Sequence, residues 1–302
     1  MAERPPARLG EALKHARAVL AAAGLDDPGL EARLLVEHFA GTTRTDAVTD
    51  PGRELTDAMR DALGAALARR AGGMPVHRVI GHRDFHGVRL SLSPATLDPR
   101  PDTEAIVDLA LELLARRPSP AILDLGTGSG AIALAVLAVR QDARAVGVDL
   151  SEEALATAVA NAAANGVADR FEAVRSDWLA AVSGRYDAIL SNPPYISTEI
   201  IDGLDREVRE HDPRIALDGG ADGLDAYRAI AADAAAHLTP GGVVIVEIGY
   251  DQAATVPPLF EAHGFMLAGR RNDLAGTVRG LAFTLADAAA GRGQKGLGTT
   301  FE

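Results

Sequence analysis

The spacing of hydrophobic positions changes twice along the chain and divides it into three parts. In residues 1–73 apolar side chains recur every three or four positions, as they do on one face of a helix. In residues 74–98 they alternate with polar ones around two glycines, which predicts a β-hairpin linker. In residues 99–286 short apolar runs alternate with helical patterns, which is typical of a mostly parallel, doubly wound α/β sheet.

The first part predicts a small helical bundle. Asp27 is a candidate N-cap with Pro28 in the turn that follows, and Gly41 is a candidate stop signal. Another helix is expected after Thr56, with arginines in its last turn and glycines after it. Loops this short are typical of natural bundles, so residues 1–73 are expected to form one domain.

The third part predicts seven strands with helices between most of them. The strands are expected at Ala121–Leu125, Ala143–Asp149, Phe171–Val174, Tyr186–Ser191, Gly242–Ile248, Phe265–Arg270 and Gly280–Leu285. The helices are expected at Ala131–Val139, Glu152–Asn165, Asp225–His237 and Gln252–His263, with an earlier one from about Pro101 to Pro118. The last two strands are close in sequence, which favours an antiparallel hairpin at the sheet edge. The Gly-rich end, residues 287–302, is predicted to be disordered.

Composition narrows the classes of protein to be considered. The 302 residues include 30 basic and 42 acidic ones, and a net charge of −12 gives no general attraction for phosphate backbones. The absence of cysteine excludes disulfides and cysteine-ligated metal sites. The first residues lack a signal peptide, and the longest apolar run, Ala131–Val139, is too short to cross a bilayer. We therefore expect a cytoplasmic protein that binds neither membrane nor free nucleic acid.

A glycine-rich turn after the first predicted strand indicates a nucleotide-like ligand. Gly126, Gly128 and Gly130 permit a tight turn and let a ligand approach the backbone, although such a turn can also bind nothing. Asp149 ends the second strand, 23 residues after Gly126, where it can accept both hydroxyls of a ribose. NAD and S-adenosylmethionine (AdoMet) both fit this pattern. Asp124 favours AdoMet, because an acid there suits a cationic sulfonium or amino group better than a pyrophosphate.

The strand at Tyr186–Ser191 ends in the sequence Asn-Pro-Pro-Tyr. If this strand lies beside the first one, Asn192 faces the ligand of the glycine turn. The Asn192 side chain and the Pro193 carbonyl offer two fixed acceptors, and Tyr195 offers a flat ring. Two acceptors suit one planar –NH2 group, as in a carboxamide or the exocyclic amine of adenine or cytosine. Catalysis would then need alignment and charge matching, without a metal or a strong base. The plain alternative is an ordinary Pro-Pro turn.

Several further segments make the chain resemble the PrmC/HemK protein-glutamine methyltransferases. These segments are Leu92–Glu104, Asp212–Ile230, Val246–Gln252 and Asp273–Gly276. Together with the glycine turn and the Asn-Pro-Pro-Tyr motif, they follow the family order over about residues 5 to 285. The resemblance implies a class I AdoMet-dependent methyltransferase fold, Rossmann-like, with a seven-stranded, mostly parallel sheet and an antiparallel edge hairpin. A helical domain that recognises the substrate protein and a β-hairpin linker would precede it.

The resemblance also implies an activity and a set of site residues. The activity is methylation, at N5, of the glutamine in the Gly-Gly-Gln motif of class-1 peptide chain release factors, with AdoMet converted to S-adenosylhomocysteine. The residues implied to bind AdoMet are Gly126, Thr127, Gly128, Ser129, Gly130, Asp149, Asp177, Trp178 and Asn192. Those implied to bind the glutamine are Asn192, Pro193, Pro194 and Tyr195, of which Asn192, Pro193 and Tyr195 would be catalytic. We expect a monomer with release factors as its partner.

Some residues near the implied site have no assigned role. Arg100, Thr103 and Glu104 match a family segment near the pocket. Thr277 and Val278 replace an Arg-Asp pair of the family, which puts contacts near the last hairpin in doubt. Three histidines, His77, His82 and His86, lie close together but lack partners that would complete a metal site, so we interpret them as solvated.

Three other functions remain as alternatives. Methylation of adenine in DNA or RNA would use the same Asn192–Tyr195 motif, but it would require a basic groove, and the arginines of residues 1–73 are interleaved with acids. An NAD-dependent oxidoreductase would leave that motif unexplained. A non-catalytic AdoMet-binding module would leave the intact motif without a use.

Overall fold

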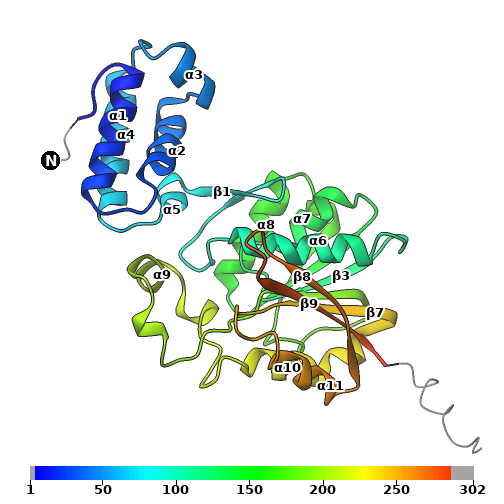
Figure 1. The fold of residues 1–302 in the computed structure, drawn as a ribbon. Coiled ribbons are helices and arrows are strands. Elements are labelled where there is room, and N and C mark those ends of the chain that lie inside the picture. Colours follow the sequence, from blue (N-terminus) through cyan, green and yellow to red (C-terminus); the bar gives the residue numbers. More distant parts are fainter. Residues whose placement is uncertain (1–3, 287–302) are drawn as a thin grey trace, which may run out of the picture. The chain divides into compact units, whose positions relative to one another are not determined.

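The computed structural model describes residues 4–286, which form two compact units (Figure 1). One unit contains the chain up to Arg83 together with Gly203–Asp212. The other contains Asp84–Asp202 and the chain from Pro213 onwards. The residues predicted to be a disordered tail, 287–302, lie outside the described part. No helix within the described residues is long and apolar enough to span a membrane.

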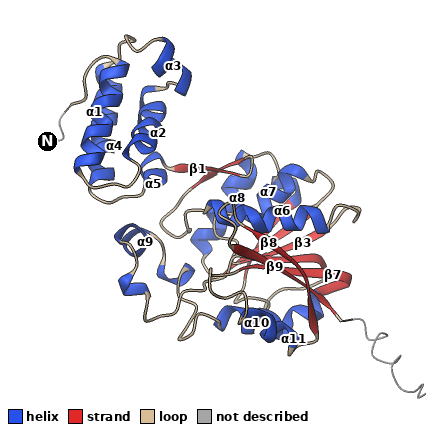
Figure 2. Cartoon of the chain, in the orientation of Figure 1, coloured by secondary structure: helices blue, strands red, loops and turns tan. Residues whose placement is uncertain are grey.

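The first unit is helical, as predicted (Figure 2). Its helices are α1 (Leu9–Ala22), α2 (Pro28–Ala40), α3 (Arg44–Thr49), α4 (Asp57–Ala71), α5 (Val76–Ile80) and α9 (Arg206–His211). The predicted caps are confirmed: the Asp27 carboxylate accepts from the Leu30 N–H at 3.0 Å and the Thr56 hydroxyl accepts from the Met59 N–H at 3.2 Å. Gly41 ends α2 at φ 59°, in the left-handed region that favours glycine.

Part of the segment predicted as a hairpin linker is helical. Helix α5 occupies its beginning, and the hairpin itself is limited to β1 (His82–Phe85) and β2 (Val88–Ser91). The prediction of an extended segment from residue 74 is therefore wrong. A helix of five residues is too short to show a helical period, and its stop signal, Gly81 at φ 88°, also lies at the start of the hairpin. Helices α3 and α9, each six residues long, escaped prediction for the same reason.

The second unit contains the predicted seven-stranded sheet, in the order β5-β4-β3-β6-β7-β9-β8. The strands are β3 (Ala121–Leu125), β4 (Arg144–Asp149), β5 (Phe171–Arg175), β6 (Tyr186–Ser191), β7 (Leu238–Glu247), β8 (Phe265–Asn272) and β9 (Val278–Leu285). Strands β3 to β7 are parallel, and β9 runs antiparallel to both β7 and β8. The doubly wound sheet and its antiparallel edge hairpin are thus confirmed.

Helices cover both faces of this sheet (Figure 1). They are α6 (Glu104–Leu113), α7 (Ala131–Val139), α8 (Glu152–Ala164), α10 (Asp225–Asp233) and α11 (Val256–Glu261), with 3₁₀ turns η1 (Pro101–Thr103), η2 (Ala168–Arg170), η3 (Ile201–Gly203), η4 (Arg214–Ala216) and η5 (Ala234–His237). One apolar core lies under α6 and α7, and the other under α10 and α11. Helix α11 is shorter than the predicted Gln252–His263. Proline is favoured in the first turn of a helix, so Pro257 favours a helix that begins at Val256, and the Gln252 side chain donates to the Tyr195 carbonyl.

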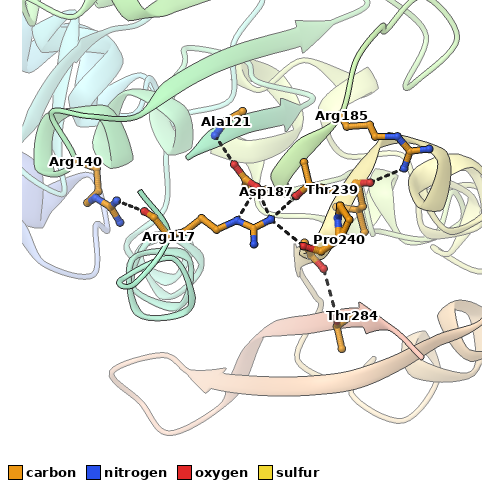
Figure 3. A network of polar contacts seen from close by, with 10 residues as sticks. Arg117, Ala121, Arg140, Arg185, Asp187, Thr239, Pro240 and Thr284 are labelled. Atoms are coloured by element: carbon orange, nitrogen blue, oxygen red, sulfur yellow. Dashed lines mark hydrogen bonds and ion pairs between the residues drawn. The ribbon is translucent and has the colours of Figure 1, made fainter. Parts of the chain in front are cut away.

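A polar cluster joins three strands at the end of the sheet where they begin (Figure 3). The Asp187 carboxylate on β6 accepts from the Ala121 N–H on β3 at 2.9 Å, the Thr239 hydroxyl on β7 at 2.7 Å and Arg117 Nε at 2.7 Å. Arg117 also donates to the Pro240 carbonyl at 2.9 Å. Burial opposes the charge, but these donors hold the pKa of Asp187 below its usual value. The cluster fixes the alignment of the strands at the end where no predicted site residue lies.

We expect Asp187→Ala to lower the free energy of unfolding by about 2–4 kcal/mol, because the Ala121 N–H and Arg117 Nε both lose their acceptor. Urea denaturation measures this loss. The control is Glu152→Ala, which removes an exposed ion pair with Arg175 whose side chains are 74% and 60% accessible. An exposed pair contributes little, so equal losses in the two variants would contradict a structural role for Asp187.

Candidate active site

A cavity of about 570 Å³ lies at the carboxyl ends of β3, β4, β5 and β6 in the second unit. Each strand contributes the residues that follow it, as expected for a parallel sheet at its topological switch point. The predicted site residues that line the cavity are Gly126, Thr127, Gly128, Ser129, Asp149, Asp177, Trp178, Asn192 and Pro194. Gly130, Pro193 and Tyr195 are not in its lining. Most of the residues predicted from the sequence to form the site therefore lie together around this cavity.

The three remaining residues do not belong to the cavity lining. Gly130 is the N-cap of α7 at φ 85°, in the left-handed region that favours glycine. Pro193 is buried. Tyr195 packs against the core under α10 and α11, and its hydroxyl donates to Glu247 Oε1 at 3.4 Å.

The glycine turn is held open by backbone hydrogen bonds and by Asp149. Gly126 at φ 69° and Gly128 at φ 55° both adopt the left-handed region. The Gly128 N–H donates to Asp149 Oδ2 at 2.9 Å, and the Ser151 N–H donates to Asp149 Oδ1 at 2.9 Å. Each carboxylate oxygen keeps a further lone pair, so Asp149 can still accept from two hydroxyls of a ligand.

Asp124 is a fully buried acid below this turn. Its Oδ2 accepts from the Thr127 hydroxyl at 2.7 Å and from the Ala133 N–H at 3.2 Å. Within the described residues its Oδ1 has no hydrogen-bond partner. Burial, aided by the nearby charge of Asp149, raises the pKa of Asp124 to about 6 against the two hydrogen bonds. A cation next to this acid would relieve that penalty.

The charge of the cavity decides between the two cofactor classes. Among the described residues that line it are four acids, Asp149, Asp177, Asp218 and Asp225, and neither a lysine nor an arginine. A pyrophosphate would meet only repulsion from these side chains, whereas a sulfonium or an amino group would be attracted. The residues present therefore fit AdoMet and disfavour a dinucleotide. Gly126–Ser129, Asp149, Asp177 and Trp178 would hold it.

Asn192 projects from the end of β6 into the cavity lining. Its Nδ2 donates to the Thr103 hydroxyl at 3.1 Å. This hydrogen bond fixes the orientation of the side-chain amide, with the Asn192 oxygen on the side away from Thr103. The preceding residue, Ser191, donates through its hydroxyl to the Leu125 carbonyl at 2.7 Å. The motif loop after β6 is thus tied to η1 and to the end of β3.

A second segment, residues 217–225, packs directly on the backbone of the motif loop. Gly219 donates through its N–H to the Ile196 carbonyl at 2.8 Å. A Cβ at Gly219 would lie 2.7 Å from the Pro194 oxygen, and one at Gly223 would lie 2.4 Å from the Tyr195 oxygen. Only glycine allows this approach, which explains the glycines of this segment.

Gln252 links the motif loop to the glycine segment. Its Nε2 donates to the Tyr195 carbonyl at 3.1 Å and to the Gly223 carbonyl at 3.2 Å. Its Oε1 accepts from the Gly249 N–H at 2.9 Å and lies 3.1 Å from the Tyr227 hydroxyl oxygen. This buried amide thus uses both of its donors and its oxygen in hydrogen bonds.

Three further polar residues hold the site: Thr103, which the sequence placed near the pocket without a role and which lines the cavity, and Glu247 and Gln252, which the sequence did not single out. Each of these residues lies in one of the segments that resemble the family, so the resemblance could have pointed to them. Their spacing along the chain alone does not indicate a role. Within the described residues no cluster of three or more potential metal ligands occurs. His86, from the group of three histidines, instead contacts Asp108 Oδ1 at 3.0 Å.

Comparisons with known proteins match both units. Residues 11–81 match the family described as the PrmC N-terminal domain, and residues 104–203 match the methyltransferase small domain. The release factor glutamine methyltransferase of Agrobacterium fabrum is 51% identical over 89% of this chain and 94% of its own length. The chain belongs to the release factor glutamine methyltransferase family. It is therefore an AdoMet-dependent methyltransferase, and the resemblance to PrmC/HemK proteins is confirmed.

Other relatives agree with this assignment. The protein of the same name from Caulobacter vibrioides is 48% identical over 80% of this chain and 84% of its own length. Among solved structures, the catalytic domain of hMettl16 in complex with the MAT2A 3′UTR hairpin 6 matches with a TM-score of 0.55 at 17% identity, over 74% of this chain and 83% of that one. At this identity the likeness supports the methyltransferase fold alone.

The departure of this family member at Thr277 and Val278 leaves the turn between β8 and β9 intact. Asp273 Oδ1 accepts from the Ala275 and Thr277 N–H groups, both at 2.9 Å. Its Oδ2 accepts from Arg279 Nε at 3.1 Å. These contacts use the Thr277 backbone rather than its side chain, so the turn does not depend on the residue type there.

We expect the stability of Asp124→Asn to differ from that of the wild type in a pH-dependent way. The folded pKa of Asp124 is raised from 3.8 to about 6, so the wild type loses stability as the pH rises through that interval. The asparagine variant carries no such charge, and the difference in the free energy of unfolding should shift in its favour by ~2 kcal/mol between pH 4 and pH 7. Urea denaturation at several pH values measures it; a constant difference would mean that Asp124 titrates normally.

Proposed function

We propose that this protein transfers the methyl group of AdoMet to the side-chain amide nitrogen of the glutamine in the Gly-Gly-Gln motif of class-1 peptide chain release factors. The observation that carries the proposal is the position of Asn192, whose fixed amide lines the same acidic cavity as the glycine turn. The family adds the substrate, since its curated members at 40–51% identity are named release factor glutamine methyltransferases.

The motif loop would activate the glutamine amide by hydrogen bonding. Bound AdoMet supplies the electrophilic methyl group. The Asn192 side-chain oxygen and the Pro193 carbonyl would accept the two amide hydrogens, which raises the electron density on an otherwise poor nucleophile. Because both acceptors are held in place before the substrate arrives, alignment costs little at the moment of reaction. Tyr195 would complete the grip on the planar amide, and the displaced proton can leave after the transfer.

We assign the parts of the chain accordingly. Residues 1–73 would recognise the substrate protein, 74–98 would link, and 99–286 would carry the chemistry. The net charge of −12 and the acidic cavity support a protein partner and argue against direct contact with nucleic acid. We propose that the enzyme works as a monomer in the cytoplasm, where release factors act.

Transfer of label from radioactive AdoMet tests this function. We expect label in a folded class-1 release factor, and none in that protein after its Gly-Gly-Gln glutamine is replaced by alanine. Duplex DNA and single-stranded RNA serve as competing substrates, because the Asn192–Tyr195 motif would also suit adenine. Label in nucleic acid with none in the release factor would establish the adenine alternative instead.

Replacement of Asn192 should separate catalysis from cofactor binding. We expect Asn192→Ala to lower kcat by about 100-fold or more, since it removes one acceptor of the transition state. The dissociation constant for AdoMet should change by only a few fold. Fluorescence of Trp178, the single tryptophan, which lines the cavity, reports AdoMet binding directly.

Asp149→Ala is the matched counterpart, because Asp149 faces the glycine turn and not the motif loop. It should weaken AdoMet binding by about 10-fold or more while kcat at saturating AdoMet changes less. A parallel loss of affinity and turnover in Asn192→Ala would make Asn192 a cofactor ligand only.

A further inference from the structure

Glu247 is a carboxylic acid at the end of β7 in an otherwise apolar core. Glu247 is only 1% exposed. Its neighbours in the chain are fully buried apolar residues: Val244, Ile245, Val246 and Ile248. Among the described residues no group hydrogen-bonds its Oε2. A buried acid costs stability relative to an apolar residue of similar size, so packing alone does not explain it.

Two hydroxyl groups of the active site converge on this carboxylate. The Tyr195 hydroxyl donates to Glu247 Oε1 at 3.4 Å, which is a long hydrogen bond. The side chain of Thr103 lies close to Glu247 and lowers the pKa of its carboxyl group. Thr103 itself accepts from Asn192 Nδ2 at 3.1 Å. Since its oxygen is the acceptor there, its one hydrogen is left to be donated to Glu247.

These side chains can form a chain of hydrogen bonds with a single direction. The Asn192 amide donates to the Thr103 hydroxyl, whose hydrogen can in turn be donated to the nearby Glu247, and the Tyr195 hydroxyl donates to the same carboxylate. Both polar side chains of the motif loop therefore depend on one acceptor. Without it, the Thr103 hydroxyl would be free to turn, and the Asn192 amide could rotate so that its nitrogen faced the substrate.

We propose that ionised Glu247 is a positioning residue for methyl transfer, which orients Asn192 through Thr103 and Tyr195 directly. This inference rests on the proposed function of the motif loop and adds a residue that touches neither the cavity nor the substrate. Glu247 acts from behind the loop, because the cavity lining includes Thr103 and Asn192 but not Glu247.

The surroundings of Glu247 make its charge state sensitive near neutral pH. Burial raises the pKa of Glu247 to about 7, while the hydrogen bonds from Thr103 and Tyr195 and the charge of Arg279 lower it and Asp102 raises it. The ionisable and charged groups that face Glu247 are Asp102 on η1, Tyr195 on the motif loop, Arg279 on β9 and Tyr227 on α10, whose hydroxyl donates to the Glu247 carbonyl at 2.9 Å. Arg279 is shared with Asp102 at 3.1 Å and Asp273 at 3.1 Å.

Positioning and folding then depend on pH in opposite directions. A raised folded pKa means that the contribution of Glu247 to stability falls as the pH rises from about 4.5 through 7. The positioning role requires the carboxylate, so kcat should rise over the upper part of the same interval. A residue that served the fold alone would produce no such rise.

The first test is the pH profile of kcat for release factor methylation between pH 5.5 and 9. The wild type should show an acid limb with its midpoint near pH 7. Glu247→Gln, which is isosteric but cannot ionise, should lower kcat by about 10- to 100-fold and lose that limb, while AdoMet affinity by Trp178 fluorescence changes less than about twofold. Wild-type kcat with an unchanged acid limb in Glu247→Gln would overturn the proposal.

Thr103 provides a matched pair of variants in case Glu247→Gln folds poorly. Thr103→Ser keeps the hydroxyl and should retain at least about 10-fold more activity than Thr103→Val, which keeps the shape but cannot relay the hydrogen bond. Equal activities in the two variants would contradict the relay.

A spectroscopic test needs no substrate and so separates this inference from the proposed function. In protein labelled with ¹⁵N-asparagine, the Asn192 side-chain amide signals are identified by their loss in Asn192→Ala. They should shift with a midpoint near pH 7 in the wild type and stay constant in Glu247→Gln. If the wild type methylates no release factor but these signals titrate, the proposed function fails and the positioning role stands. Signals that do not respond to Glu247 would refute the positioning role.

Discussion

The parallel pairing of β3 with β6 is the constraint on which the active site depends. These strands are far apart in sequence, yet Leu125 and Ser191, their last residues, are direct partners in the sheet. The glycine turn and the motif loop therefore begin side by side, as at any switch point of a doubly wound sheet. The middle of both strands is apolar and fully buried, as at Ile122, Leu123 and Ile189, so most polar groups lie near the strand ends. The ion-pair cluster around Asp187 holds the opposite ends of the same strands.

Rigidity of the motif loop follows from contacts on its far side. Two prolines restrict its dihedral angles, and Gln252 binds the Tyr195 carbonyl from behind. Gly219 and Gly223 pack against the carbonyl oxygens of Pro194 and Tyr195, so closely that no larger residue would fit between the two segments. An activation that works by two hydrogen-bond acceptors needs such preorganisation, since each acceptor is effective only in a narrow range of positions. The buried polar groups of this region thus trade stability for a fixed geometry.

Local patterns in the sequence predicted the elements that carry a continuous apolar run. The bounds of β6 and α7 agree with the prediction, because each element contains an uninterrupted run of apolar residues. The glycine turn and Asn192 were also found, since they interrupt such runs. The role of Thr103, and any part of Glu247 and Gln252 in the site, could not be predicted, because their contacts with the motif loop join residues 89, 52 and 57 positions apart. Only the folded sheet brings these residues together.

In the proposed mechanism the Asn-Pro-Pro-Tyr motif recognises a planar amine and does not by itself distinguish glutamine from adenine, so the rest of the chain would supply that choice. The connectivity supports a role for the helical unit. After the motif loop the chain leaves the catalytic unit at Gly203, forms α9 within the helical unit, and returns at Pro213. Within that unit Arg70 pairs with Glu207 at 2.6 Å, and Arg78 pairs with Asp212 at 2.9 Å. The two units are therefore joined by three stretches of chain, two of which lead directly to the motif loop and to the glycine segment that packs on it. A helical unit that served only as an appended binding module would need a single linker.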